Sequence, residues 1–136
     1  MNERLIATLA RLRDDPALAA HLYEDLFNSR FWTLAWRSGV GAGGYVGCQR
    51  ADGGWEIPVF THPDRSFLTR LAIDIPAAQR VSVEGKTLWE QILNDYLDDR
   101  VTRVVVDPGE AHAILLARDM VLGMVNRYGI ASDCDA

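Results

Sequence analysis

Histidine side chains, together with nearby carboxylates, are the groups in this chain that could bind a metal ion. The three histidines are His21, His62 and His112, and no pair has the His-x-x-x-His spacing that places two ligands on one helix face. A site that combines His62 and His112 with Asp64 and Asp107 would require two distant loops to converge. We therefore predict turn or capping roles for these side chains and no metal site.

Adjacent carboxylates and cysteines are the other candidates for chemistry. The carboxylate pairs are Asp14-Asp15, Glu24-Asp25 and Asp98-Asp99, each at an expected helix end or polar helix face, where capping and solvation account for it. Cys48 and Cys134 form no Cys-x-x-Cys, and no Gly-x-Ser-x-Gly elbow is present. We interpret Cys48 as a small buried hydrophobe. The sequence predicts no catalytic residue and no cofactor.

The glycines from Gly39 to Gly44 formally match the Gly-x-Gly-x-x-Gly fingerprint of dinucleotide-binding loops. That fingerprint requires a helix immediately afterwards, because the helix N-terminus holds the pyrophosphate. Here a strand pattern follows at Tyr45–Ala51, and the chain then turns at Asp52-Gly53-Gly54. We interpret the glycines as a connection between strands.

Composition and charge indicate one globular domain. The chain has 136 residues, of which 49% are apolar and 24% charged, and its formal net charge is −5. The arginines are scattered singly, which argues against nucleic-acid binding because that function needs a basic face. No apolar run is long enough to cross a bilayer, so we expect no membrane contact and a cytoplasmic location. We predict one domain over residues 1–130 and a flexible tail at 131–136.

Hydrophobic periodicity predicts a single compact α+β domain, in which a mixed sheet of about six strands is flanked by about five helices. Helices are expected from Leu5 to Leu12, from Asp15-Pro16 through Phe27, from Thr61 to Arg70, from Thr87 to Leu97 and from Arg118 to Tyr128. Strands are expected over Phe31–Arg37, Tyr45–Ala51, Trp55–Phe60, Gln79–Glu84, Val101–Val106 and His112–Leu116.

Two of the helix starts carry capping signatures. Thr61-His62-Pro63-Asp64 and Thr87-Leu88-Trp89-Glu90 each place a hydroxyl residue three positions before an acidic one, so Thr61 and Thr87 are predicted N-caps. Pro58, in the strand before Thr61, donates no backbone hydrogen bond. It therefore predicts an edge position, a bulge or an N–H side that faces away from the neighbouring strand.

The tryptophans are the residues that point most directly to a binding surface, because tryptophan is favoured at interface anchors. Periodicity places Trp32, Trp36 and Trp89 in the core. Trp55 lies beside the glycine turn, where it could be an exposed anchor or a core residue.

Two short motifs, in this order and at this separation, suggest a family. Ile57-Pro58-Val59-Phe60-Thr61 precedes a short helix, and Val104-Val105-Val106-Asp107-Pro108-Gly109 is an apolar strand ending in a turn. These segments resemble the PVFT strand and the strand ending in Asn-Pro-Gly of the SseB N-terminal domain family. The resemblance extends from Leu18 to Tyr128, and its motif residues are Pro58, Val59, Phe60, Thr61, Asp107, Pro108 and Gly109. Asp107 replaces the family's usual asparagine, and the second, C-terminal domain of many members has no counterpart in this sequence.

The resemblance implies a compact domain of the bacterial cytoplasm, in a family named for enhanced serine sensitivity, associated with type III secretion and without an established enzymatic activity. Together with the missing catalytic set, it favours a non-enzymatic protein-interaction or regulatory domain with an unknown protein partner. We expect the contacts with a partner or ligand at Trp55, Thr61, His62 and Asp64.

Two alternatives stay open. One is a small-molecule (anion) binding protein or cryptic enzyme, with a cleft between Gly39–Gly44, Thr61–Asp64 and Asp107–Gly109, because free amides at a helix start bind anions. The other is an acidic secretion chaperone, which requires a large exposed apolar patch or a homodimer groove.

Overall fold

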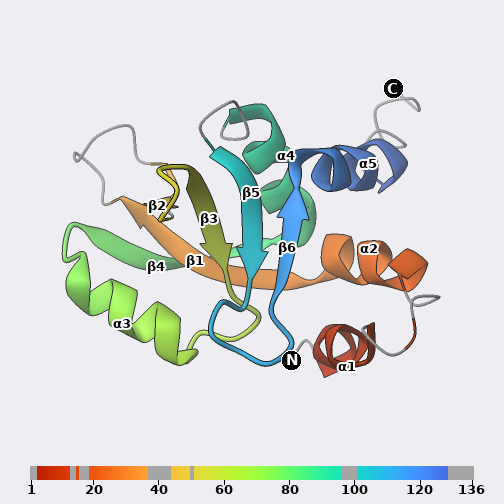
Figure 1. Ribbon diagram of the computed structural model, residues 1–136, viewed down its shortest axis with the longest axis horizontal. Coiled ribbons are helices and arrows are strands. Elements are labelled where there is room, and N and C mark those ends of the chain that lie inside the picture. The colour runs from red at the N-terminus through yellow and green to blue at the C-terminus, as the bar shows by residue number, and fades with distance from the viewer. Residues whose placement is uncertain are drawn as a thin grey trace.

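The computed structural model describes residues 3–12, 15, 19–36, 44–49, 51–95 and 101–128. These residues form five helices and six strands (Figure 1), which confirms the predicted α+β class. In chain order they are α1 (Glu3–Leu12), α2 (Ala19–Asn28), β1 (Arg30–Trp36), β2 (Cys48–Gln49), β3 (Trp55–Val59), α3 (Ser66–Asp74), β4 (Ala78–Glu84), α4 (Gly85–Asp95), β5 (Val101–Val106), β6 (Ile114–Ala117) and α5 (Arg118–Tyr128). None of these described helices combines the length and apolar character needed to cross a bilayer. The tail predicted at 131–136 lies outside the described residues.

The strands form two sheets, where the sequence predicted a single mixed one. β1 and β4 form an antiparallel pair, and a four-stranded sheet has the order β2-β3-β5-β6. In the larger sheet β3 and β5 are parallel, whereas the outer pairs are antiparallel. Phe60, directly after β3, exchanges two backbone hydrogen bonds of 2.8 Å with Trp32 of β1. This bridge places the end of β3 beside β1 and connects the two sheets.

Two elements begin and end at the predicted residues, and others differ from the prediction. β5 and α5 have the predicted bounds. β2 is shorter than the predicted strand, although Tyr45 makes an isolated bridge with Ala35. β6 starts later than predicted because the N–H of Ala113 donates to the carbonyl of Glu110, at 3.1 Å, in the turn before it.

The main core lies on one face of the four-stranded sheet. Residues that share this face form rows across the strands, such as Ile57 of β3, Val104 of β5 and Leu116 of β6, and each is at most 1% exposed. Buried residues of α1, α2, α4 and α5 pack against these rows. Because neighbours along a strand point to opposite faces, Glu56 and Arg103 fall on the other face, where they form an ion pair of 2.8 Å.

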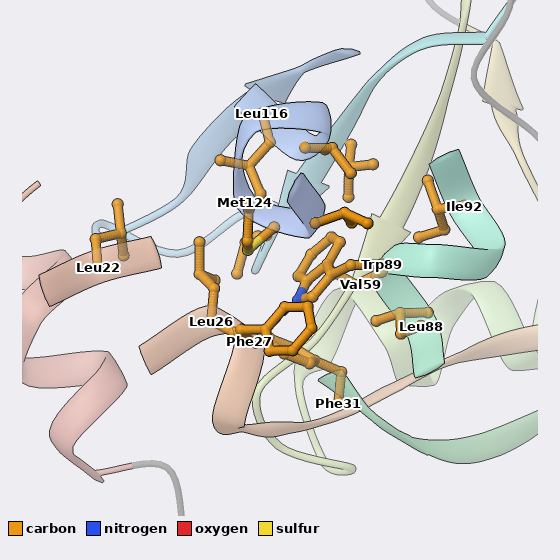
Figure 2. Packing of buried hydrophobic residues seen from close by; sticks show 14 of the residues in the cluster. Leu22, Leu26, Phe27, Phe31, Val59, Leu88, Trp89, Ile92, Leu116 and Met124 are labelled. Carbon is orange, nitrogen blue, oxygen red and sulfur yellow. Dashed lines mark hydrogen bonds between the residues drawn. The ribbon is translucent and has the colours of Figure 1, made fainter. Parts of the chain in front are cut away.

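Trp89 of α4 is the largest fully buried side chain of this core (Figure 2). Its ring meets Phe31 edge to face, with 5.2 Å between ring centroids and 72° between planes. Its Nε1–H donates to the carbonyl of Leu26 at 2.9 Å. The polar tip is therefore satisfied while the ring buries its full apolar area, and the prediction of a core position for Trp89 is confirmed.

A smaller core lies between α3 and β1. Leu34, Phe60 and Leu68 are buried in it, and Trp32 and Trp36 pack against them as partly buried residues. The opposite face of β1 contributes to the main core. Both faces of β1 are therefore covered.

Pro58 sits in the middle of β3 without removing a hydrogen bond from the ladder with β5. Its carbonyl accepts a hydrogen bond of 2.7 Å from the hydroxyl of Thr33 in β1. The N and C=O of one residue point to the same side of a strand, so the missing N–H also faces β1 and not β5. This corresponds to the third of the three predicted arrangements.

Gly85 begins α4 in direct contact with the end of α2. We call Gly85 and the carbonyls of Leu26, Phe27 and Ser29 the Gly85 corner. The N–H of Gly85 donates to the carbonyl of Ser29 at 2.6 Å. A Cβ on Gly85 would lie 2.5 Å from the oxygen of Leu26, 2.7 Å from that of Ser29 and 2.8 Å from that of Phe27. The predicted N-cap at Thr87 is wrong, because the helix starts two residues earlier against these carbonyls.

Candidate functional site

Thr61 and Asp107 come together because each follows one of two parallel strands. β3 and β5 are in register up to Val59 and Val106, and the carboxyl ends of parallel strands meet at the same sheet edge. The N–H of Asp107 then donates to the carbonyl of Val59 at 2.8 Å. In return, the carboxylate of Asp107 accepts the backbone N–H of Thr61 on Oδ1 at 2.8 Å and its hydroxyl on Oδ2 at 2.6 Å. Thr61 and Asp107 are both 0% exposed.

The turn after β5 holds the Asp107 carboxylate in place. Asp107 has φ 52°, and Gly109 has φ 89°. Aspartate tolerates this left-handed region better than most side chains, and glycine enters it without cost. The N–H of Glu110 donates to the carbonyl of Asp107 at 3.1 Å, with Pro108 at the position where its fixed φ suits the turn. The predicted turn roles of Pro108 and Gly109 are confirmed.

Arg65 binds the buried carboxylate from the β3–α3 side. Its Nη2 lies 3.0 Å from Thr61 Oγ1 and 3.4 Å from Asp107 Oδ2, and its Nη1 lies 3.0 Å from Glu110 Oε1. Arg65 is also the residue that precedes α3, and no side chain caps this helix. The predicted N-cap role of Thr61 is therefore wrong, because its hydroxyl donates to Asp107.

His112 binds the same carboxylate from the β6 side, with Nε2 at 2.6 Å from Oδ2. We call Thr61, Arg65, Asp107, Glu110 and His112 the Asp107 corner. The corner satisfies one buried negative charge with donors from two segments of the chain, the β3–α3 connection and the turn before β6, as a buried carboxylate requires.

Two hollows adjoin the Asp107 corner. The first, of about 140 Å³, is lined by Arg65, Ser66, Phe67, Arg70, Pro108, Gly109 and Glu110. The second, of about 440 Å³, is lined by Leu9, Ala10, Leu12, Ala111, His112, Ala113 and Ile114. The first is rich in charged side chains, whereas His112 is the one ionisable side chain among the described residues that line the second.

The predicted contact residues do not form one surface. Trp55 is 38% exposed but begins β3, so it lies about 20 Å from Thr61 at ~3.3 Å per strand residue. Thr61 is buried. His62 and Asp64 are accessible beside it, and the N–H of Asp64 donates to His62 Nδ1 at 3.1 Å. Of the predicted cleft, the Thr61 and Asp107 segments meet, while residues 39–43 lie outside the described residues.

Arg65, Glu110 and the pairing of His112 with Asp107 were missed by sequence reasoning. The available signal was the position of Thr61 and Asp107 directly after two apolar strands, which places both at one sheet edge only if the strands are parallel. Among the described residues, no three His, Cys, Asp or Glu side chains are grouped as a metal site.

Cys48 in β2 is only partly buried, whereas the sequence predicted a buried residue. Burial raises the pKa of its thiol, and the nearby carboxylate of Glu56 raises it further. The thiolate is therefore disfavoured, which is the opposite of what a nucleophilic cysteine requires.

No protein-family model matches this chain, and no curated protein matches it either. The resemblance to the SseB N-terminal domain family stays a prediction.

Proposed function

We propose that this protein is a non-enzymatic interaction or regulatory domain that binds a partner protein through the outer face of α3. We include in this proposal the SseB-type resemblance, a bacterial cytoplasmic location and the association with secretion, which depend on the sequence motifs alone. The observation that carries the proposal is the exposure of large apolar side chains on α3.

Among the described residues, the exposed large apolar side chains are Trp55, Phe67, Ile73 and Leu115. Phe67 and Ile73 both belong to α3, and Ile73 is 74% exposed. Arg70 lies between them on the exposed side of the helix and makes no ion pair with a described residue. Figure 1 shows α3 at the edge of the molecule, where a partner can reach it.

The smaller hollow extends this surface to the turn after Asp107. Phe67 lines the hollow, and a Cβ on Gly109 would lie 3.9 Å from the Phe67 side chain. Burial of Phe67 and Ile73 in a complex should contribute about 1–2 kcal/mol each. Arg70 would pair with an acidic side chain of the partner, which gives orientation more than affinity.

A second candidate function is the binding of a small anion in the same hollow. It is favoured by the meeting of the Thr61 and Asp107 segments and by the two arginines, Arg65 and Arg70, that line the hollow. However, Arg65 is already paired with Asp107 and Glu110, and the Glu110 carboxylate would repel an anion. We therefore rank this candidate second.

Site-specific photocrosslinking tests the proposed partner. Benzoylphenylalanine replaces Ile73 in one variant and exposed Asn126 of α5 in a matched control, and both are irradiated in a lysate of the source organism. We expect one protein to crosslink at position 73 and not at 126, and the yield to fall when Arg70→Glu is added. Equal crosslinking at both positions, or none at 73, contradicts the proposal.

Phosphate titration separates the two candidates. If the hollow is an anion site, millimolar phosphate shifts the backbone NMR signals of Ser66 and Phe67, and Arg70→Glu abolishes the shifts. No response to phosphate, together with a crosslinked partner, leaves the interaction function alone.

A further inference from the structure

His112 has one ring nitrogen committed to Asp107 and the other still available. Because an ionised carboxylate only accepts hydrogen bonds, the 2.6 Å contact with Asp107 Oδ2 places the proton on His112 Nε2. In a neutral imidazole Nδ1 is then the acceptor. Asp107 thus selects the tautomer, and its own position is over-determined by Thr61, Arg65 and the turn.

Nδ1 of His112 has no hydrogen-bond partner among the described residues. Within the described part of the chain, the only buried side-chain nitrogen or oxygen without a partner is Nε of Arg65. The only hydrogen bond of His112 in that part of the chain joins Nε2 to Asp107. Since the side chain is 13% exposed and lines the larger hollow, we infer that Nδ1 is accessible from this hollow.

The hollow beside His112 has apolar side-chain walls. Its other lining residues are Leu9, Ala10, Leu12, Ala111, Ala113 and Ile114, and its volume of about 440 Å³ suits a small molecule. Among the described lining residues, no side chain carries a fixed charge.

The α1 wall of the hollow is firmly attached. Leu9 is 4% exposed in the main core. On the other side of α1, buried Asp25 of α2 accepts from Arg4 at 3.0 Å and from Thr8 at 3.2 Å. The hollow therefore exists before any ligand arrives.

We propose that this hollow binds a small, uncharged apolar compound that carries a hydroxyl group, whose O–H donates to Nδ1 of His112. The apolar part of the ligand contacts Leu9, Leu12 and Ile114. Asp107 is a positioning residue, since it acts on the ligand only by holding His112 in the accepting tautomer. This site is separate from the α3 surface and goes beyond the proposed interaction function.

Phenol and anisole are the matched probes, because anisole has the same ring but cannot donate a hydrogen bond. Binding is followed through the NMR signals of the Leu9, Leu12 and Ile114 methyl groups at pH 8. We expect the wild type to bind phenol about fivefold more tightly than anisole, the factor that one hydrogen bond of ordinary strength contributes. His112→Phe should abolish this preference while retaining the apolar walls.

Asp107→Asn separates positioning from structure. An amide N–H facing Nε2 would move the imidazole proton to Nδ1, so the preference for phenol should be lost and the ¹⁵N shifts of the two ring nitrogens should exchange. A wild-type ring already protonated on Nδ1 overturns the proposal. So does equal binding of phenol and anisole by the wild type, or no methyl response to either probe. If Asp107→Asn does not fold, His112→Phe and the wild-type ¹⁵N spectrum decide the question.

Discussion

The Gly85 corner and the Asp107 corner both fasten a helix or turn to a distant segment, but by different means. At Gly85 the contact is made by backbone alone, through a 2.6 Å hydrogen bond and an approach that leaves no room for a Cβ. At Asp107 the contact is made by side chains, with one buried carboxylate shared by Thr61, Arg65 and His112. The first joint depends on the absence of a side chain, the second on the chemistry of several.

This difference bears on where a ligand could be recognised. The joint at Gly85 contributes no side chain of its own, although Arg30, Glu84 and Lys86 line a hollow of about 370 Å³ beside it. A side-chain joint leaves the outer parts of its members accessible, and here Arg65 and His112 each line a hollow. Rigid support of an accessible polar group is a requirement of binding sites, so the Asp107 corner is the region in which we place the candidate site.

The largest effect should come from filling the space at Gly85. In Gly85→Ala the new methyl group would overlap three carbonyl oxygens of the backbone at 2.5 to 2.8 Å, and backbone cannot move aside as a flexible side chain does. We expect a loss of unfolding free energy of about 3 kcal/mol or more, at the upper end for overpacking. Urea unfolding followed by circular dichroism measures it. A loss below about 1 kcal/mol would show that the corner relaxes, and the comparison with Asp107 would fail.

Removing the buried carboxylate should have the next largest effect. Asp107→Ala leaves Arg65 and His112 without their shared acceptor and places alanine at φ 52°. We expect a loss of about 2–3 kcal/mol, below the usual cost of breaking a buried ion pair because both partners keep some access to solvent. Asp64→Ala, which removes an exposed carboxylate, is the control and should change stability by less than about 0.5 kcal/mol.

Asparagine at position 107 sharpens this test. It tolerates the left-handed backbone and can still accept the N–H of Thr61, so we expect a smaller loss than in Asp107→Ala. If the two variants lose the same stability, the charge and not the geometry of Asp107 holds the corner together.

The elements of this fold could be predicted from sequence where local pattern decides them. The β-branched run Val101–Val106 and the helix Arg118–Tyr128 have the predicted bounds, because periodicity and the flanking turn residues act within the segment itself. The starts of α3 and α4 could not be predicted in the same way. Thr61 and Thr87 satisfy the capping pattern, but a tertiary partner competes with the local one: Asp107 takes the hydroxyl of Thr61, and the carbonyls at the Gly85 corner move the start of α4.

The candidate site was only partly accessible to sequence reasoning for the same reason. Thr61 and Asp107 stand out as motif residues, yet their contact depends on the parallel pairing of β3 and β5. Arg65 and His112 have no signature of their own. Gly85 has no signature of this kind either, since its contact with the end of α2 depends on tertiary packing that no local pattern records.

A hydroxyl deletion at Thr61 measures the contribution of one bond in the polar joint. Thr61→Val keeps the shape and the backbone N–H bond to Asp107 but removes the donor to Oδ2 and the acceptor of Arg65. We expect a loss of about 1–2 kcal/mol. Thr61→Ser retains the hydroxyl and should lose less, and the reverse order would mean that packing of the methyl group outweighs the hydrogen bonds.

The smallest effect, and one of opposite sign, should come from the glycine that makes no close approach. Gly123 lies inside α5, and a Cβ built there would meet no atom within 4 Å. Gly123→Ala should therefore stabilise the protein by about 0.5–1 kcal/mol, because alanine loses less backbone entropy than glycine when it enters a helix. Thermal unfolding should show a higher midpoint. Set against Gly85→Ala, this variant separates the steric requirement at the Gly85 corner from the general effect of replacing glycine in a helix; destabilisation at both positions would remove that distinction.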